Sequence, residues 1–178
     1  MHFSPILLSL VATASAIDIY AYRSNEQCKG TDYLMCTNRN PGDCCAGANG
    51  NAYRAIGVRA IPSSWNIIGR GHRDAYCGPV RYAAASNGAT DVCAGGNYYS
   101  GGSYIFAGKK HKRSGNSADV STRSSGEACK ADLVVLGDDT KYDLTKLDDA
   151  QYAELLAVFH AGGNSTAVPA KFEAFKIE

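Results

Sequence analysis

The sequence contains no apolar run long enough to cross a bilayer. A membrane-spanning helix needs about 20 consecutive apolar residues, and the most apolar stretch, from Ile6 to Ala12, is far shorter. The sequence also lacks a strong net charge, because 18 basic residues oppose 17 acidic ones and give a formal charge of +1. A near-neutral chain is a poor general binder of polyanions. We therefore expect no membrane span and no nucleic-acid partner.

Motifs for metal binding and nucleophilic catalysis are missing as well. Zinc sites favour cysteines and histidines at short spacings such as C-x₂-C, and no two cysteines here have that spacing. No serine lies in a G-x-S-x-G elbow. The acidic pairs Asp138-Asp139 and Asp148-Asp149 fit a turn and a helix start, where carboxylates are favourable. We expect no metal and no cofactor.

The first 16 residues have the features of a secretory signal peptide. Their apolar run ends in Ala14-Ser15-Ala16, the small-x-small pattern that signal peptidase accepts. We expect cleavage after Ala16 and secretion to the extracellular region. In that oxidising environment cysteines form disulfides rather than metal or redox sites.

All cysteines follow this segment, and they predict a cysteine-rich disulfide framework. They are Cys28, Cys36, Cys44, Cys45, Cys77, Cys93 and Cys129. Because seven is odd, at most three disulfides form within the chain and one cysteine stays unpaired. Cys44 and Cys45 should have different partners, since disulfide geometry rarely closes between neighbours. Cys129 is the only cysteine of the C-terminal part, so we expect it to bond to a cysteine between Cys28 and Cys93.

Alternating apolar and polar residues predict a mainly β (α+β) fold. A hairpin is expected first, from Ile17–Tyr22 and Tyr33–Cys36, followed by a turn at Asn40–Asp43. Arg70–Asp74 fits a polar turn, and Arg81–Ala85 fits a strand or a short helix equally well. The further expected strands are Tyr53–Ile61, Trp65–Ile68, Ala75–Val80 and Ser103–Ala107.

Residues 128–178 predict a β-hairpin followed by a helix. Asp148, with Gln151 three residues later, forms a capping-box pattern, and apolar residues at helical spacing run from Tyr152 to Phe159. The preceding stretch, residues 108–127, combines KKHKR with a Ser/Gly-rich tract. It cannot bury enough apolar surface to fold, so we expect a flexible loop there.

The first ninety residues after the signal peptide resemble the βγ-crystallin Greek-key pair. Cys28-Lys29-Gly30 stands where that family has aromatic-x-Gly. A strand that begins with Trp65 opens a second unit, in which Cys77-Gly78 and Ser103 are weaker matches to the family's motif. The chain is similar to the secreted branch of this fold, which includes killer-toxin-like and antifungal proteins, and to small cysteine-rich fungal proteins. The resemblance implies a disulfide-stapled Greek-key β-sandwich. Calcium binding is not implied, because Arg54 replaces an oxygen ligand of the family's site.

One compact group of residues suits an enzyme. A secreted nuclease needs acid–base groups and a cation near the phosphate, and Arg70, His72, Arg73 and Asp74 are together in the sequence. His111 or Glu26 would supply a second acid–base group. The same four residues also fit a solvated hairpin tip, the usual place for polar side chains, and we favour this second interpretation.

Three other features are candidate sites. Lys112-Arg113 fits a dibasic processing site in an exposed loop or a plain solvated loop. Asn164 begins an Asn-Ser-Thr glycosylation sequon, which fits a loop of a secreted chain. The tyrosines Tyr98, Tyr99 and Tyr104 fit a recognition surface or the sandwich core.

The sequence thus predicts a signal peptide (1–16), a disulfide-rich β-sandwich domain (17–107), a flexible basic and Ser/Gly-rich loop (108–127) and a hairpin–helix extension (128–178). The leading hypothesis is a secreted, non-enzymatic interaction protein, an effector or antimicrobial protein. Its partner would be an extracellular protein or a cell-surface or cell-wall ligand of another cell. The alternatives are a small secreted hydrolase that uses the His72 group and a cell-wall or carbohydrate-binding protein.

Overall fold

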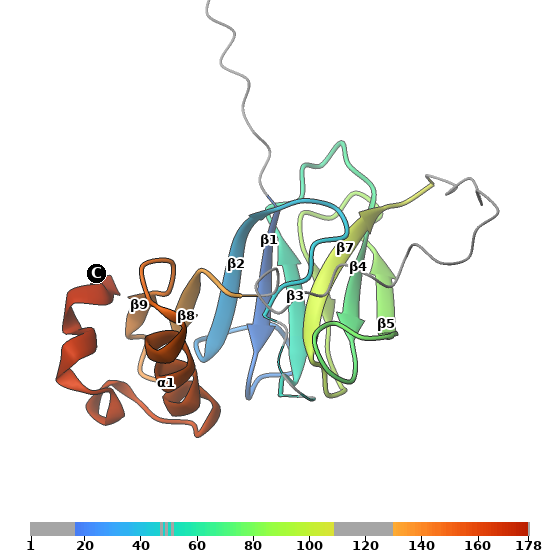
Figure 1. Cartoon of the computed structure of the whole chain (residues 1–178). Helices are drawn as coiled ribbons and strands as arrows, with labels where there is room; N and C mark the ends of the chain where they lie inside the picture. The colour runs from blue at the N-terminus through green and yellow to red at the C-terminus, as the bar shows by residue number, and fades with distance from the viewer. Residues whose placement is uncertain (1–16, 47, 49, 51, 109–129, 178) are drawn as a thin grey trace, which may run out of the picture.

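The computed structural model describes residues 17–46, 48, 50, 52–108 and 130–177. These residues form two antiparallel β-sheets packed face to face, with a few helices at one side (Figure 1). The strands are β1 (Ile17–Tyr22), β2 (Tyr33–Arg39), β3 (Ala55–Arg59), β4 (Ile67–His72), β5 (Val80–Ala85), β6 (Val92–Ala94), β7 (Gly101–Phe106), β8 (Leu133–Val135), β9 (Lys141–Asp143) and β10 (Lys176–Ile177). The helices are α1 (Asp149–His160) and the short 3₁₀ helices η2 (Ser165–Ala167) and η3 (Ala170–Phe175).

The larger sheet has the strand order β10-β9-β8-β2-β1-β3-β6, and the smaller sheet has the order β5-β4-β7. The hydrophobic core lies between them, where glycines on the smaller sheet allow a close approach. A Cβ atom at Gly102 would lie 2.4 Å from Cγ2 of Ile56, and one at Gly71 would lie 2.4 Å from the ring of Tyr99. Side chains of the larger sheet and the β6–β7 region fill the space that these glycines leave.

The sandwich consists of two four-segment units that exchange one segment. The first unit contains β1, β2, residues 42–46 and β3, and the second contains β4, β5, β6 and β7. Residues 42–46 leave the first sheet and lie along β7, where the Cys45 amide donates to the Gly102 carbonyl at 2.8 Å. Correspondingly, β6 of the second unit lies in the larger sheet, where it pairs with β3 of the first unit. The first strands of the two units, β1 and β4, also share one burial pattern along their six residues.

Three disulfides join the described cysteines, and two of them follow this exchange. Cys28, in the β1–β2 loop, bonds to Cys93 on β6, and Cys77, in the β4–β5 loop, bonds to Cys44 in the exchanged segment. Each of the two links the hairpin loop of one unit to the exchanged segment of the other. The third disulfide is Cys36–Cys45. Three is the predicted maximum, and the prediction that Cys44 and Cys45 have different partners is confirmed.

The prediction that Cys129 bonds to a cysteine between Cys28 and Cys93 is wrong. All six cysteines in that range are already paired with one another, and Cys129 itself lies outside the described residues. The described residues of the C-terminal part are attached by backbone pairing, since β8 pairs with β2 and so continues the larger sheet.

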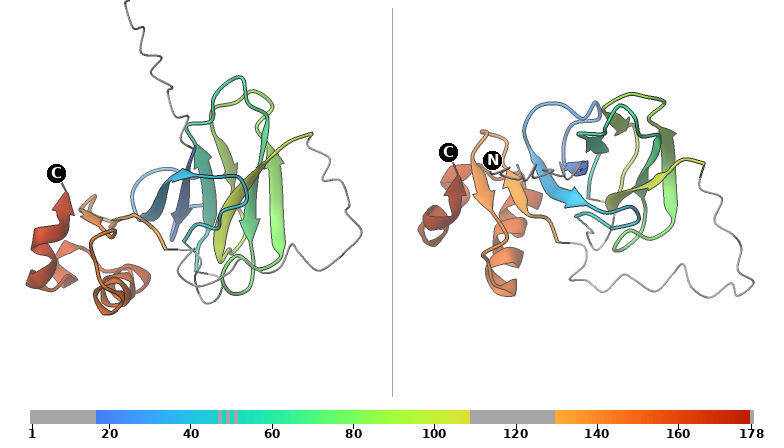
Figure 2. Two further views of the ribbon diagram at one scale, coloured as in Figure 1. Left: turned by 45° about the horizontal axis from the view of Figure 1, so that its top comes forward. Right: turned by 90° about the horizontal axis from the view of Figure 1, so that it is seen from above.

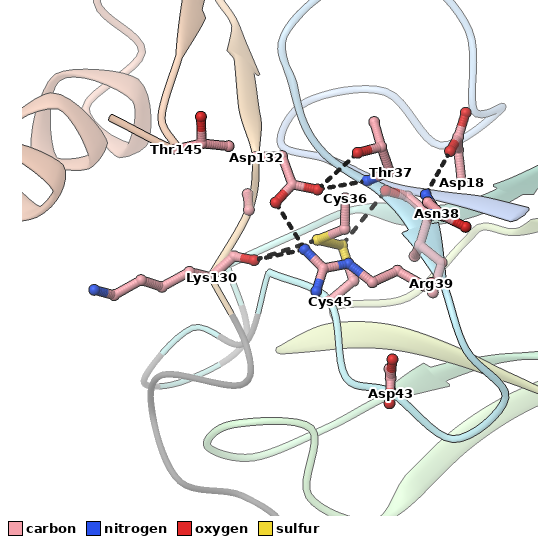
Figure 3. A network of polar contacts seen from close by, with 12 residues as sticks. Asp18, Cys36, Thr37, Asn38, Arg39, Asp43, Cys45, Lys130, Asp132 and Thr145 are labelled. Carbon is pink, nitrogen blue, oxygen red and sulfur yellow. Dashed lines mark hydrogen bonds and ion pairs between the residues drawn. A yellow bond between two sulfur atoms is a disulfide. The ribbon is translucent and has the colours of Figure 1, made fainter. Parts of the chain in front are cut away.

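A polar network strengthens this attachment (Figure 3). One carboxylate oxygen of Asp132 accepts hydrogen bonds from the amide of Thr37 at 2.7 Å and from its hydroxyl at 3.0 Å. The other accepts from the guanidinium of Arg39 at 2.9 Å, and that guanidinium also donates to the carbonyl of Lys130 at 3.3 Å. The β2–β8 junction is therefore held by backbone pairing and by a charged side-chain network.

The C-terminal elements agree with the predicted hairpin and helix. The capping box is present, with Asp148 accepting from the Gln151 amide at 2.8 Å and the Gln151 side chain accepting from the Asp148 amide at 3.2 Å. Leu155 and Phe159 of α1 are fully buried, and Phe172 of η3 is buried with them in the core. Figure 2 shows that these helices extend from the β8–β9 side of the sandwich, away from the smaller sheet.

The region around His72 differs from the prediction. The expected turn at Arg70–Asp74 is wrong, because β4 continues to His72, and the expected strand at Ala75–Val80 is a loop up to the last residue, where β5 begins. The inward positions of β4 include Gly69 and Gly71, so the strand lacks the apolar alternation that marks its neighbours. Arg81–Ala85 is a strand, as one of the two interpretations had it.

Two predicted segments cannot be compared with the structure. The signal peptide, and the basic loop from residue 109 onward, lie outside the described residues. Within the described part of the chain, no helix is long and apolar enough to span a membrane.

Candidate functional site

Large exposed apolar side chains gather at one end of the sandwich. Among the described residues, five such side chains are exposed by 40% or more: Tyr76, Val80, Tyr82, Tyr98 and Ile177. The first four belong to the β4–β5 loop, the start of β5 and the loop before β7, and we call these four the tyrosine end. Arg81 ties the segments together by donating to the side-chain oxygen of Asn97 at 3.1 Å.

The backbone of the tyrosine end is fixed while its side chains remain exposed. The amide of Tyr76 donates to the carbonyl of Ala48 at 3.0 Å, and the next residue, Cys77, forms the disulfide to Cys44. Tyr82 lies on β5, where its cross-strand partner is Gly71. The surface therefore presents aromatic groups from a covalently held frame, which lowers the entropy lost on binding.

Tyr98 is positioned by a charged neighbour. The guanidinium carbon of Arg54 lies 4.4 Å from the centre of the Tyr98 ring, a cation–π distance. Arg54 also donates to the Tyr98 hydroxyl and forms an ion pair with Glu26. Glu26, considered from sequence as a catalytic carboxylate, is therefore paired with this arginine.

The other two tyrosines named from sequence belong to the core. Tyr99 is fully buried and packs against Gly71, and Tyr104 is 2% exposed, with its hydroxyl donating to the carbonyl of Arg39 at 2.9 Å. Only Tyr98 of the three is on the surface. Sequence reasoning missed Tyr76 and Tyr82, because the fold rather than the sequence brings them to the same end.

A second tyrosine cluster covers the outer face of the larger sheet. The rings of Tyr20 and Tyr22 lie 5.1 Å and 5.3 Å from that of Tyr33, and the Arg59 guanidinium lies 4.7 Å from the Tyr20 ring. Burial raises the pKa of Tyr22 to about 12. The cluster packs beside Cys28, so its first role is structural. The alternation in Ile17–Tyr22, which puts Tyr20 and Tyr22 on one face, could have revealed it.

The fold divides the predicted catalytic group. Arg70 and His72 lie on β4, whereas Arg73 and Asp74 lie in the following loop, both more than half exposed and 4.0 Å apart. His72 is only 8% exposed. Its Nδ1 lies 2.7 Å from the Gly78 carbonyl, and its Nε2 lies 2.7 Å from the hydroxyl of Ser103. Burial, with the nearby Arg70, lowers the pKa of His72 below its usual value.

The remaining predicted sites are separate from these residues. Asn164 is exposed, and its side-chain oxygen accepts from the Thr166 amide at 3.1 Å. His111, Lys112 and Arg113 lie outside the described residues. In the described part of the chain, no group of three or more His, Cys, Asp or Glu side chains is placed to hold a metal ion.

These features define the class as a mainly β, disulfide-stapled sandwich protein with an exposed aromatic end. The model of the ARB_05566_N family, described as an N-terminal domain, matches residues 18–134. Because this match covers more than half of the chain, the protein belongs to that family. No curated protein and no solved structure matches the chain.

Proposed function

We propose that the protein is a secreted, non-enzymatic interaction protein that binds another cell's surface or an extracellular protein through the tyrosine end. The observation that carries the proposal is that four of the five large exposed apolar side chains of the described residues belong to segments at one end of the smaller sheet, the β4–β5 loop, the start of β5 and the loop before β7. Exposed apolar groups that cluster mark interaction sites more often than scattered ones do. Tyrosine is also enriched at protein interfaces and among residues that dominate binding energy.

Secretion and the effector or antimicrobial role belong to the same proposal. Three disulfides within the described residues support an oxidising compartment, and the N-terminal segment has the signal-peptide pattern. The exposed Asn164 supports glycosylation in that compartment. Processing after Lys112-Arg113 and a boundary between the sandwich and residues 128–178 are part of the proposal too.

We further propose that the sandwich is a Greek-key pair of the βγ-crystallin kind. The exchange of residues 42–46 and β6 between the two units supports this, because each sheet then combines three strands of one unit with one segment of the other. The two disulfides from Cys28 and Cys77 support it as well, since they occupy matching places in the two units. Both cysteines also have positive φ angles, 55° and 54°.

The proposal is tested by binding of the fluorescently labelled protein to intact cells and isolated cell walls of candidate target organisms. The double variant Tyr82→Ser/Tyr98→Ser should lose at least tenfold in affinity, because loss of interface hot spots costs about 2 kcal/mol or more. The matched control is Ile177→Ser, which removes the exposed apolar residue that lies outside the tyrosine end. Equal binding by the double variant and the control would contradict the proposal.

A competition experiment separates the two kinds of ligand. Soluble cell-wall oligosaccharides should displace the protein only if it is a carbohydrate-binding protein, whereas pretreatment of the cells with protease should abolish binding only if its partner is a protein. Activity on RNA that His72→Gln abolishes would instead favour the hydrolase.

A further inference from the structure

The outer face of the smaller sheet carries a group of polar side chains that the proposed function does not use. Arg70 on β4 lies directly opposite Ser103 on β7 and Ala83 on β5. Directly opposed residues of an antiparallel pair, and alternate residues of one strand, share a face of the sheet. Arg70, His72 and Ser103 are therefore on one face, and α1 lies at the far side of the molecule from it (Figure 1).

The hydrogen bonds of His72 determine where its proton lies. The Gly78 carbonyl can only accept, so Nδ1, at 2.7 Å, carries the proton of the neutral ring. Nε2 is then unprotonated and accepts from the Ser103 hydroxyl at 2.7 Å. In this state Ser103 has no proton left to donate to anything else.

Arg70 is a half-buried cation without a counter-charge. Among the described residues, Arg70 has no ion pair and no side-chain hydrogen bond. Burial lowers the pKa of its guanidinium, and no neighbouring charge raises it. Its directly opposed neighbours, Ala83 and Ser103, have short side chains without a charge. A half-buried guanidinium is favourable when it meets an anion.

We propose that Arg70, Ser103 and His72 form a binding site for a tetrahedral oxyanion, the sulfate or phosphate group of a ligand, and that binding is coupled to protonation of His72. The guanidinium supplies two parallel N–H donors, the geometry that suits such an anion. When Nε2 takes up a proton from solvent, it donates to the oxygen of Ser103. The hydroxyl proton of Ser103 is then released from His72 and donates to the anion beside Arg70.

Of the groups around His72, Arg70 is the one charge that opposes protonation of the ring. From its own strand Arg70 faces it, from the β4–β5 loop the Gly78 carbonyl, and from β7 Ser103; its partner on β5 is the uncharged Val80. The charged residues of that loop, Arg73 and Asp74, are more than half exposed. The positive charge of Arg70 disfavours the imidazolium until an anion arrives, so anion and proton bind together.

The test follows the ring protons of His72 by NMR through a pH titration of the full chain, in sodium sulfate and in sodium chloride of equal ionic strength. Sulfate serves as the probe because it stays doubly charged across the range. The midpoint of His72 should rise by about one pH unit in sulfate, which corresponds to about tenfold tighter binding to the protonated form. His160, whose pKa burial and Arg23 also lower, is the internal control and should not move. Equal shifts of the two histidines would overturn the proposal.

Two variants locate the site. Arg70→Gln should abolish the sulfate-dependent shift, whereas Arg81→Gln, on the same sheet but bonded to Asn97, should retain it. Ser103→Ala should weaken the coupling between sulfate and His72 by removing the hydroxyl that links them. A shift of unchanged size in Arg70→Gln would contradict the site. The same titration is then repeated with inorganic phosphate, with a sulfated oligosaccharide and with a phosphorylated oligosaccharide. The comparison identifies which source of the oxyanion binds more tightly.

Discussion

The three disulfides should contribute unequally to stability, in an order set by the loops they close. Their sequence separations are 65 residues for Cys28–Cys93, 33 for Cys44–Cys77 and 9 for Cys36–Cys45. A disulfide stabilises mainly by restricting the unfolded chain, and the effect grows with the logarithm of the loop length. The relevant loop is the one that opens while the other two disulfides remain.

By this measure Cys28–Cys93 and Cys44–Cys77, the two long disulfides, should contribute nearly equally to the free energy of unfolding. When either is removed, the shortest remaining path between its cysteines runs through the other two bridges and covers about 25 residues. The loop-closure relation gives ~3.5 kcal/mol for each long disulfide and ~2.6 kcal/mol for the short one. Replacing the short disulfide by two alanines should therefore cost about 1 kcal/mol less than replacing either long one.

The assay is urea unfolding of the three double-alanine variants in a Cys129→Ser background, so that the odd thiol cannot exchange. The comparison separates chain entropy from packing around the sulfurs, because Cys36 and Cys45 are fully buried while Cys93 is exposed. If packing around the sulfurs dominated, the short disulfide would be the costliest to remove. A Cys36→Ala/Cys45→Ala variant less stable than both others would refute the chain-entropy reasoning.

Three further predictions follow from the contacts between and beside the sheets. Gly102→Ala should lower the free energy of unfolding by about 1–3 kcal/mol through overpacking against Ile56, measured by urea denaturation with the open-space variant Gly137→Ala as control. Asp132→Ala should cost about 1–3 kcal/mol and speed hydrogen exchange in β8, whereas unchanged exchange there would contradict the role of its network. Because burial lowers the folded-state pKa of His72 and His160 below the unfolded value of about 6.5, the unfolded chain binds more protons below that pH. Their contribution should be complete above pH of about 6.5 and be lost progressively as the pH falls below it; stability that is flat between pH 5 and 7 would refute this.

Much of the fold could be predicted from local patterns. The alternation in β1 and the capping box of α1 predicted those elements because single-element rules decide them. The strand expected at Trp65–Ile68 covers only the first residues of β4. The rest of β4 was missed because its inward positions hold Gly69 and Gly71, where a larger side chain would collide with the facing residues. The three-residue strand β6 was missed because it is too short to show a period.

Features that depend on contacts between distant segments could not be predicted. The disulfide partners follow from the exchange of residues 42–46 and β6, which no local pattern encodes. The tyrosine end likewise combines two loops with the start of β5, and none of these segments has a sequence pattern that indicates a site. The bond between His72 and Ser103 depends on the register of β4 with β7, which places them on one face.

The most direct test of the proposed interaction is a hydroxyl-radical footprint of the full chain, free and bound to the target cell walls or protein. Binding through the tyrosine end should reduce the oxidation of Tyr76, Tyr82 and Tyr98 several-fold, because contact removes water from exposed rings. Tyr20, on the outer face of the larger sheet, should keep its oxidation rate. Protection of Tyr20 with unchanged oxidation of the other three tyrosines would contradict the account and place the interaction on the opposite sheet.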